Sequence, residues 1–142
     1  MISKRPNSHD LSGASVLSEP TKPVPNNKVI DWLTANEGNL VVDAIIMGEL
    51  CVGILALPRG RKRTQLEQWF GNVVQTIDCL PWDATISRRW AKLVMDLKQK
   101  GDKLPLLDSM IAATTLQHDL TVATRNTRDF NKTGVQVLNP FA

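Results

Sequence analysis

The chain has 142 residues, enough for one domain with a buried core, and its 42% hydrophobic and 22% charged residues are ordinary for a globular protein. The net charge of +3 permits a polyanionic partner without requiring one. The most apolar stretch, residues 40–57, is interrupted by Asp43 and Glu49, which argues against a membrane span, and the polar first 25 residues argue against a signal peptide. We therefore expect a cytoplasmic protein.

The first half of the chain predicts a polar start followed by helices around one short strand. Residues 1–10 carry no pattern, and prolines between residues 20 and 25 predict a stiff connector. Asn26 or Asn27 is placed to cap a helix, and residues 40–42 are apolar and typical of a strand. Asp43 can cap the next helix, whose apolar residues recur at helical spacing: Ile46, Leu50, Ile54 and Leu57.

The second half predicts three more helices and two strands. A helix over residues 64–77 would turn Leu66, Trp69, Phe70 and Val73 inward. Asp83 caps a helix that stops near Gly101, and residues 105–118 form another. Residues 121–124 and 135–138 are rich in residues that favour strands.

Short strands that alternate with helices indicate an α/β fold with a mostly parallel sheet, because parallel strands need helical crossovers. An all-helical fold is the alternative, but it leaves residues 121–124 and 135–138 without a role. The two cysteines, Cys51 and Cys79, lie in apolar stretches and match no metal or redox spacing. We interpret them as buried, reduced thiols of a cytoplasmic protein.

Three acidic residues stand out: Glu49 inside an apolar helix, Asp108 at a helix start, and Asp129 after a strand. Each has a structural explanation when taken alone. Glu49 can lie on the solvent side of its helix, Asp108 can interact with the helix dipole, and Asp129 can be a turn residue. For any one of them this explanation is the stronger.

Taken together, the three acids suggest a metal site. Strand ends and helix starts meet at the edge of an open parallel sheet where ligands bind, so the three carboxylates are expected to converge there. Neither histidine has a partner at ligand spacing, and carboxylates suit Mg²⁺, with Mn²⁺ as an alternative. Such an ion polarises a phosphate and lowers the pKa of an attacking water. Asn126 adds a neutral oxygen that could hold a water of the ion.

Four segments of the chain resemble the PIN-domain family, in particular the VapC and FitB-type toxins of toxin–antitoxin pairs. Residues 45–54, with Gly-Glu-Leu at their centre, resemble the helix that carries the family's Glu. Residues 106–114 resemble the helix of the third acid, and residues 120–130 the closing strand and acidic loop. The ending 137–141 is also similar. The later motifs are specific in combination, whereas Gly-Glu-Leu alone is weak.

The resemblance implies a three-layer α/β/α fold, Mg²⁺-dependent endoribonuclease activity on RNA, a homodimer and a cognate antitoxin. By matching motif, Glu49, Asp108 and Asp129 are the expected metal-binding and catalytic acids. The same match makes Asn126 a catalytic-site residue and places Thr124 beside it. Residues 13–142 would form the domain, preceded by an altered or disordered segment, 1–12.

The beginning of the chain departs from the family pattern. PIN domains usually open with a strand that ends in Asp-Thr-Asn, followed by a helix start similar to the Val-Leu-Ser-Glu found here at 16–19. In this chain Gly13 stands where the Asp is expected and Ser15 where the Asn is expected. Asp10 is three residues early and is a poor substitute in a strand. Either the first strand has degenerated or the reading frame was altered upstream of Val16.

Two functions from different classes therefore remain open. One is a ribonuclease impaired by the loss of its first acid, and the other is an inactive PIN module that dimerises and binds an antitoxin. Arg125 and Arg128 flank the proposed site and could contact RNA phosphate, while the dense basic run at 59–63 is more typical of a solvated helix junction. The helical tryptophans suggest core or dimer contacts rather than base stacking: Trp32, Trp69 and Trp90.

Overall fold

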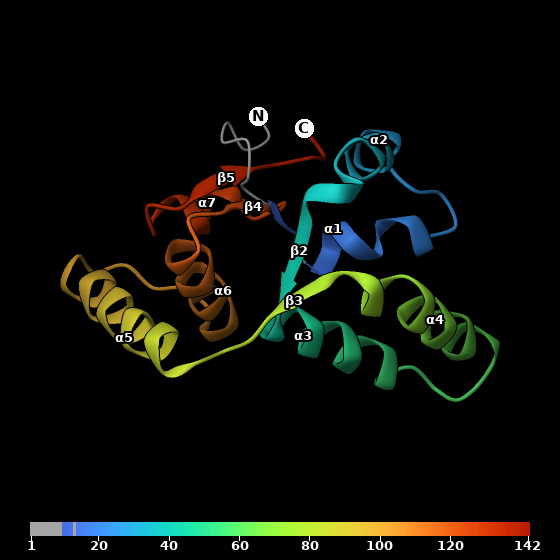
Figure 1. The fold of residues 1–142 in the computed structure, drawn as a ribbon, viewed down its shortest axis with the longest axis horizontal. Helices are drawn as coiled ribbons and strands as arrows, with labels where there is room; N and C mark the ends of the chain where they lie inside the picture. Colours follow the sequence, from blue (N-terminus) through green and yellow to red (C-terminus); the bar gives the residue numbers. More distant parts are fainter. Residues whose placement is uncertain (1–9, 13) are drawn as a thin grey trace.

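The computed structural model describes residues 10–12 and 14–142; Gly13 and residues 1–9 lie outside the described residues. Five short strands form one parallel sheet in the order β3-β2-β1-β4-β5 (Figure 1). The strands are β1 (Asp10–Ser12), β2 (Leu40–Asp43), β3 (Asp78–Leu80), β4 (Thr121–Ala123) and β5 (Gln136–Leu138). The expected α/β class with a short parallel sheet is confirmed.

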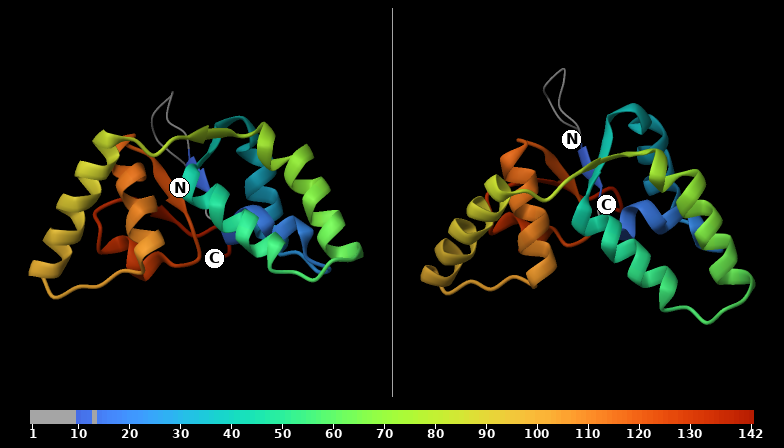
Figure 2. Two further views of the ribbon diagram at one scale, coloured as in Figure 1. Left: turned by 90° about the horizontal axis from the view of Figure 1, so that it is seen from below. Right: turned by 60° about the horizontal axis from the view of Figure 1, so that its bottom comes forward.

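Seven α-helices within the described residues connect and cover the strands. They are α1 (Ala14–Ser18), α2 (Asn27–Ala35), α3 (Ala44–Leu55), α4 (Arg61–Asn72), α5 (Ala84–Gln99), α6 (Leu106–Gln117) and α7 (Thr127–Asn131). Three short 3₁₀ turns add η1 (Glu19–Thr21), η2 (Glu37–Asn39) and η3 (Val74–Thr76). Helices α5 and α6 pack together at one end of the molecule, and α3 and α4 lie at the other (Figure 2). No helix within residues 10–12 and 14–142 is long and apolar enough to cross a membrane.

Strand β1 lies at the centre of the sheet. Leu11 pairs with Val41 of β2 on one side and with Val122 of β4 on the other. The segment 1–12 was expected to be altered or disordered; its last three residues form this strand because neighbours on both sides supply backbone hydrogen bonds. The loops after β1, β2 and β4 consequently leave the sheet at the same edge.

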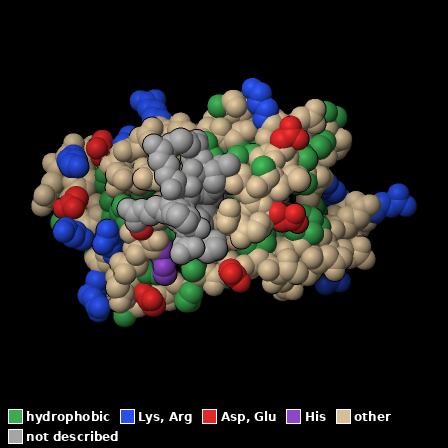
Figure 3. Space-filling view, turned by 45° about the horizontal axis from the view of Figure 1, so that its top comes forward, with side chains coloured by type: hydrophobic (Ala, Val, Ile, Leu, Met, Phe, Trp, Pro, Cys, Tyr) green, Lys and Arg blue, Asp and Glu red, His purple; other side chains and the backbone are tan. Residues whose placement is uncertain are grey.

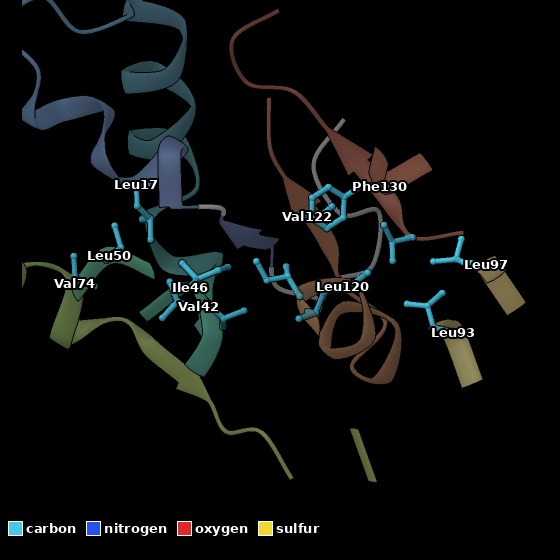
Figure 4. Packing of buried hydrophobic residues seen from close by; sticks show 14 residues of the cluster. Leu17, Val42, Ile46, Leu50, Val74, Leu93, Leu97, Leu120, Val122 and Phe130 are labelled. Carbon is cyan, nitrogen blue, oxygen red and sulfur yellow. The ribbon is translucent and has the colours of Figure 1, made fainter. Parts of the chain in front are cut away.

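The core lies against the central strands and extends toward both helical ends. Around α3 it contains Leu17, Val42, Ile46, Leu50 and Val74, and beside α5 and α6 it contains Leu93, Leu97, Leu120, Val122 and Phe130 (Figure 4). The helix starts agree with the caps expected from the sequence. The side chains of Asn26, Asp43 and Asp83 accept hydrogen bonds from the first turns of α2, α3 and α5, respectively.

The predicted helix over residues 64–77 was wrong at both ends. Helix α4 begins at Arg61 and ends at Asn72, and the chain then tightens into η3 before strand β3, which the sequence did not predict. This change of helical period turns Val73 outward, 45% exposed, and buries Val74 in its place.

The expectation of two buried thiols was also wrong for Cys79. Strand β3 is an edge strand, and its central residue Cys79 is exposed, whereas Cys51 is half-buried on α3. Both are free cysteines, as expected.

Candidate active site

A pocket of about 200 Å³ lies at the edge of the sheet where β1 and β4 end. Ala14 and Ser15 reach it from the start of α1, Glu49 from α3 and Asp108 from the first turn of α6. The segment after β4 closes it with Thr124, Arg125 and Asn126. The structure thus brings Glu49, Asp108 and Asn126, which are far apart in the sequence, to one place.

Asn126 links two of the expected acids. Its side-chain Nδ2 donates to Oδ2 of Asp108 at 3.2 Å and to Oδ2 of Asp129 at 3.0 Å. Asp129 lies in the first turn of α7 and also pairs with Lys132, whose Nζ lies 3.4 Å from its Oδ1. An amide with two hydrogens therefore satisfies a pair of carboxylates that would otherwise repel each other.

The acids of the pocket are unequally stabilised in their charged forms. Burial, and then repulsion by Asp108 and Asp43, raises the pKa of Glu49 above its ordinary value. Burial also raises the pKa of Asp108, the hydrogen bond from Asn126 opposes this, and Asp129 adds to it. The pKa of Asp129 is lowered, mainly by the hydrogen bond from Asn126. Carboxylates with raised pKa values gain most from a nearby cation.

The Glu49 carboxylate also lacks a hydrogen-bond partner among the described residues for one of its oxygens. Its Oε1 is buried and has no hydrogen-bond partner among the described residues. A buried carboxylate oxygen without a partner is costly, and a cation or a water held by one would satisfy it. The oxygen-only donor set of Glu49, Asp108 and Asp129 suits a hard ion such as Mg²⁺.

The donors do not form a closed cage. Within the described part of the chain, no three Asp, Glu, His or Cys side chains lie close enough together to hold one ion directly. In proteins Mg²⁺ usually keeps several waters and contacts only one or two carboxylates. Glu49 and Asp108 are the pair that lines the pocket, and Asp129 reaches it through Asn126.

Asp43 is an acid whose place beside the site the sequence did not reveal. It was predicted only as a helix cap, and its Oδ1 does accept from the Ile46 N–H at 2.8 Å. Asp43 is 1% exposed, and its Oδ2 has no hydrogen-bond partner among the described residues. Burial raises its pKa, although the Ile46 N–H and the Thr114 side chain act to lower it. Its charge acts on Glu49. The sequence did not indicate that Asp43 is buried beside Glu49, because an exposed helix cap has the same sequence pattern as a buried one.

The basic residues near the site differ in their surroundings. Both arginines are exposed, but only Arg125 lines the pocket, and Arg128 lowers the pKa of Asp129 weakly. In the run at 59–63, Arg63 pairs with Glu67 at 2.8 Å and Lys62 donates to the Thr21 carbonyl at 3.2 Å. On the face drawn in Figure 3, the described Lys and Arg side chains lie around the outline rather than in one patch.

None of the tryptophans lines the pocket that contains the acids. Trp32, Trp69 and Trp90 are all half-buried, and Trp69 packs against the core. Trp90 donates from Nε1 to the Ser109 hydroxyl at 2.9 Å and packs edge-on against Trp82. These contacts agree with a packing role for Trp69 and Trp90.

Comparison with known proteins gives the site its context. The sequence pattern of the PIN domain matches residues 14–136, and the described pocket residues lie within this range. The toxin FitB from Neisseria gonorrhoeae is 33% identical over 92% of this chain and 97% of its own length. A VapC ribonuclease from Sinorhizobium fredii is 34% identical over 89% of this chain and 94% of its own length.

A solved structure agrees with this relationship. The crystal structure of FitAcB from Neisseria gonorrhoeae contains a chain that superposes with a TM-score of 0.86 at 33% identity, covering 92% of this chain and 97% of that one. Matching sequence, matching fold and the acidic pocket at the edge of the sheet point to the same assignment. The chain belongs to the PIN-domain family.

Proposed function

We propose that this chain is a metal-dependent endoribonuclease and the toxin of a toxin–antitoxin pair. The observation that carries the proposal is the pocket in which Glu49, Asp108 and Asn126 converge, with Asp129 joined to it through Asn126. The relatives named as FitB toxin and VapC ribonuclease support the same assignment. We expect the reaction to take place in the cytoplasm, where an RNA substrate is available.

The cofactor we propose is Mg²⁺, with Mn²⁺ as a substitute. Glu49 and Asp108 would hold it directly, and Asp129 through water or after Asn126 moves aside. When bound, the ion supplies Lewis-acid activation of the phosphodiester and a lower pKa for the attacking water. Asn126 can then present its amide oxygen to a water, and Arg125 lies where it can meet a phosphate oxygen at the mouth of the pocket.

We further propose that the activity is impaired. The family's first Asp is replaced by Gly13, and the residues that follow it, Ala14 and Ser15, line the acidic pocket. With one carboxylate fewer, the ion is less well fixed, and a misplacement of about 1 Å can cost roughly a hundredfold in rate.

The second candidate is an inactive PIN module that retains only its partner surfaces. Two observations favour it: Gly13 in place of the acid, and the amide of Asn126, which already satisfies Asp108 and Asp129 without a cation. In either case we propose an antitoxin partner and a homodimer. Exposed apolar side chains such as Val52 and Leu55 on α3 offer surface for such contacts.

The deciding experiment compares three chains in an RNA-cleavage assay with Mg²⁺ and with EDTA. They are the chain as it stands, a restored chain with Gly13→Asp, Ala14→Thr and Ser15→Asn, and the restored chain that also carries Asp108→Asn. We expect slow or absent cleavage, clear Mg²⁺-dependent cleavage, and loss of that cleavage, respectively. Equal rates for the first two chains would contradict the impairment. Full activity of the third would contradict the carboxylate assignment.

A further inference from the structure

Arg125 is held in place by an aromatic ring near the end of the chain. Its guanidinium carbon lies 3.8 Å from the centroid of the Phe141 ring, within the distance at which a cation is attracted to the ring face. Arg125 also lines the acidic pocket. The ring therefore holds a positive charge in the pocket that also contains the carboxylates of Glu49 and Asp108.

Both partners of this contact lie on backbone that local hydrogen bonds fix. Strands β4 and β5 pair with Ala123 opposite Leu138, so the segments that follow them leave the sheet side by side. The Thr124 N–H donates to the Leu138 carbonyl at 2.9 Å, and the Phe141 N–H donates to Oδ1 of Asn139 at 3.0 Å. The guanidinium is thus placed before any ligand arrives.

The contact with the ring leaves the hydrogen-bond donors of Arg125 free. Aromatic stacking uses the face of the guanidinium, whereas its five N–H donors lie in the plane and point outward. Among the described residues, no carboxylate pairs with Arg125 and no acceptor receives its N–H groups. The nearby Glu19 is engaged elsewhere, since its Oε2 lies 2.8 Å from Lys22 Nζ and its Oε1 accepts the Asn26 N–H at 3.0 Å.

Arg128 provides the contrast. It belongs to the same segment and is exposed like Arg125, but it does not line the pocket, and no ring holds it among the described residues. The sequence could not distinguish the two arginines, because both flank the acidic loop.

We propose that Phe141 is a positioning residue that presents Arg125 to a backbone phosphate of single-stranded RNA at the mouth of the acidic pocket. The proposal rests on the function proposed above and adds which arginine binds phosphate and what holds it there. A phosphate oxygen pair matches the planar fork of a guanidinium, and a preorganised fork loses less entropy on binding.

The test measures the affinity of a short fluorescein-labelled single-stranded RNA by anisotropy in EDTA at several salt concentrations. EDTA prevents metal-dependent cleavage, so binding is separated from the integrity of the metal site. We expect Arg125→Gln to weaken binding and to reduce the salt slope by about 0.7, the value for one phosphate contact with a single strand. The matched control Arg128→Gln should change both quantities less.

The role of Phe141 is tested by a double-mutant cycle. Phe141→Leu should weaken binding roughly two- to fivefold, and Phe141→Tyr, which keeps the ring, should retain most of the affinity. In the Arg125→Gln background, Phe141→Leu should cost almost nothing further, because the positioned group is already gone. A merely structural Phe141 would instead weaken both backgrounds equally. Thermal unfolding of each variant checks the fold.

Two other results would contradict the proposal. Unchanged binding in Phe141→Leu, or additive losses in the cycle, would overturn the positioning role and leave the proposed ribonuclease intact. If the unaltered chain binds no RNA in EDTA, this inference fails, whereas the proposed function is decided separately by the cleavage assay with Mg²⁺.

Discussion

The Asn126 side chain determines which carboxylates of the site have a hydrogen-bond donor. Its amide donates to Asp108 and Asp129, so two acids are stabilised where a cation would otherwise be needed. Glu49 receives no such help and keeps a buried oxygen without a partner among the described residues. The demand for a cation therefore centres on Glu49 and the side of Asp108 that faces the pocket.

The position of Gly13 leads to a prediction for metal affinity. Gly13→Asp should bind Mg²⁺ more tightly than the unaltered chain, because a first carboxylate adds a direct contact to a weakly held, hydrated ion. Isothermal titration calorimetry measures this directly. Gly13→Asn is the matched control, since it adds a side chain of similar size without the charge. Equal affinity of the unaltered chain and Gly13→Asp would contradict the argument that a ligand is missing.

Sequence reasoning succeeds for some residues of the site and not for others. Glu49 and Asp108 could be chosen because a carboxylate among apolar neighbours is unusual in any packed element. Phe141 could not, because a single aromatic residue near the end of a chain has no pattern, and its contact with Arg125 arises only through the pairing of β4 with β5. Asp43 was predicted only as a helix cap, whereas in the structure it also raises the pKa of Glu49.

At the scale of elements, the predictions held where apolar spacing and caps agree. Helices α3 and α5 have both signals, and strands β2, β4 and β5 are short apolar or β-branched runs. Helix α6 follows Pro105 without a side-chain cap and was predicted from its apolar residues alone. Strand β3 lacks such a signal, because an edge strand that exposes Asp78 and Cys79 shows neither alternation nor an apolar run. The error at α4 has the same origin, since the apolar residues at 73 and 74 continue the helical spacing past its true end.

The cap of α3 gives a prediction for stability. Asp43→Ala should lower the free energy of unfolding by about 1 kcal/mol relative to Asp43→Ser, because serine still offers an acceptor to the Ile46 N–H. Asp43→Ser should be at least as stable as the unaltered chain at neutral pH, since it removes a buried carboxylate oxygen that has no partner among the described residues. Urea unfolding measures both differences.

Asp83 is the matched control for this pair. It caps α5 through the Ile86 N–H at 2.8 Å in the same way, but its side chain is exposed. Asp83→Ala should therefore lose about as much stability as a lost cap costs, roughly 1 kcal/mol, while Asp83→Ser should gain nothing. If Asp43→Ser were markedly less stable than the unaltered chain, the buried Asp43 carboxylate would not lower the free energy of unfolding, and the prediction would be wrong.

At the scale of the whole molecule, five acids of the described residues have shifted pKa values, and they divide into two groups with opposite effects on stability. Burial raises the pKa values of Asp43, Glu49 and Asp108, so each holds its proton more tightly in the folded than in the unfolded chain. Partners lower the pKa values of Glu19 and Asp129, Lys22 for the first and Asn126 for the second. The first group loses stability as the pH rises through its raised pKa values, and the second loses it as the pH falls through its lowered ones.

These signs predict an unusual pH profile for the metal-free protein. In EDTA, the urea midpoint should be highest near pH 4 to 5, about the ordinary pKa values of Asp and Glu, and should fall as the pH rises above this range through the raised pKa values of the buried acids. Millimolar Mg²⁺ should reduce this fall, because a cation stabilises the charged forms of Glu49 and Asp108 and binds only the folded chain.

The double variant Glu49→Gln with Asp108→Asn should have a flatter profile in EDTA and lose the response to Mg²⁺. Asp129→Asn is the contrasting control, since its removal should lower the midpoint at neutral pH without flattening the fall. A metal-free midpoint that rises from pH 5 to 8, or a Mg²⁺ response that survives in the double variant, would show that the buried acids do not govern the stability of this fold.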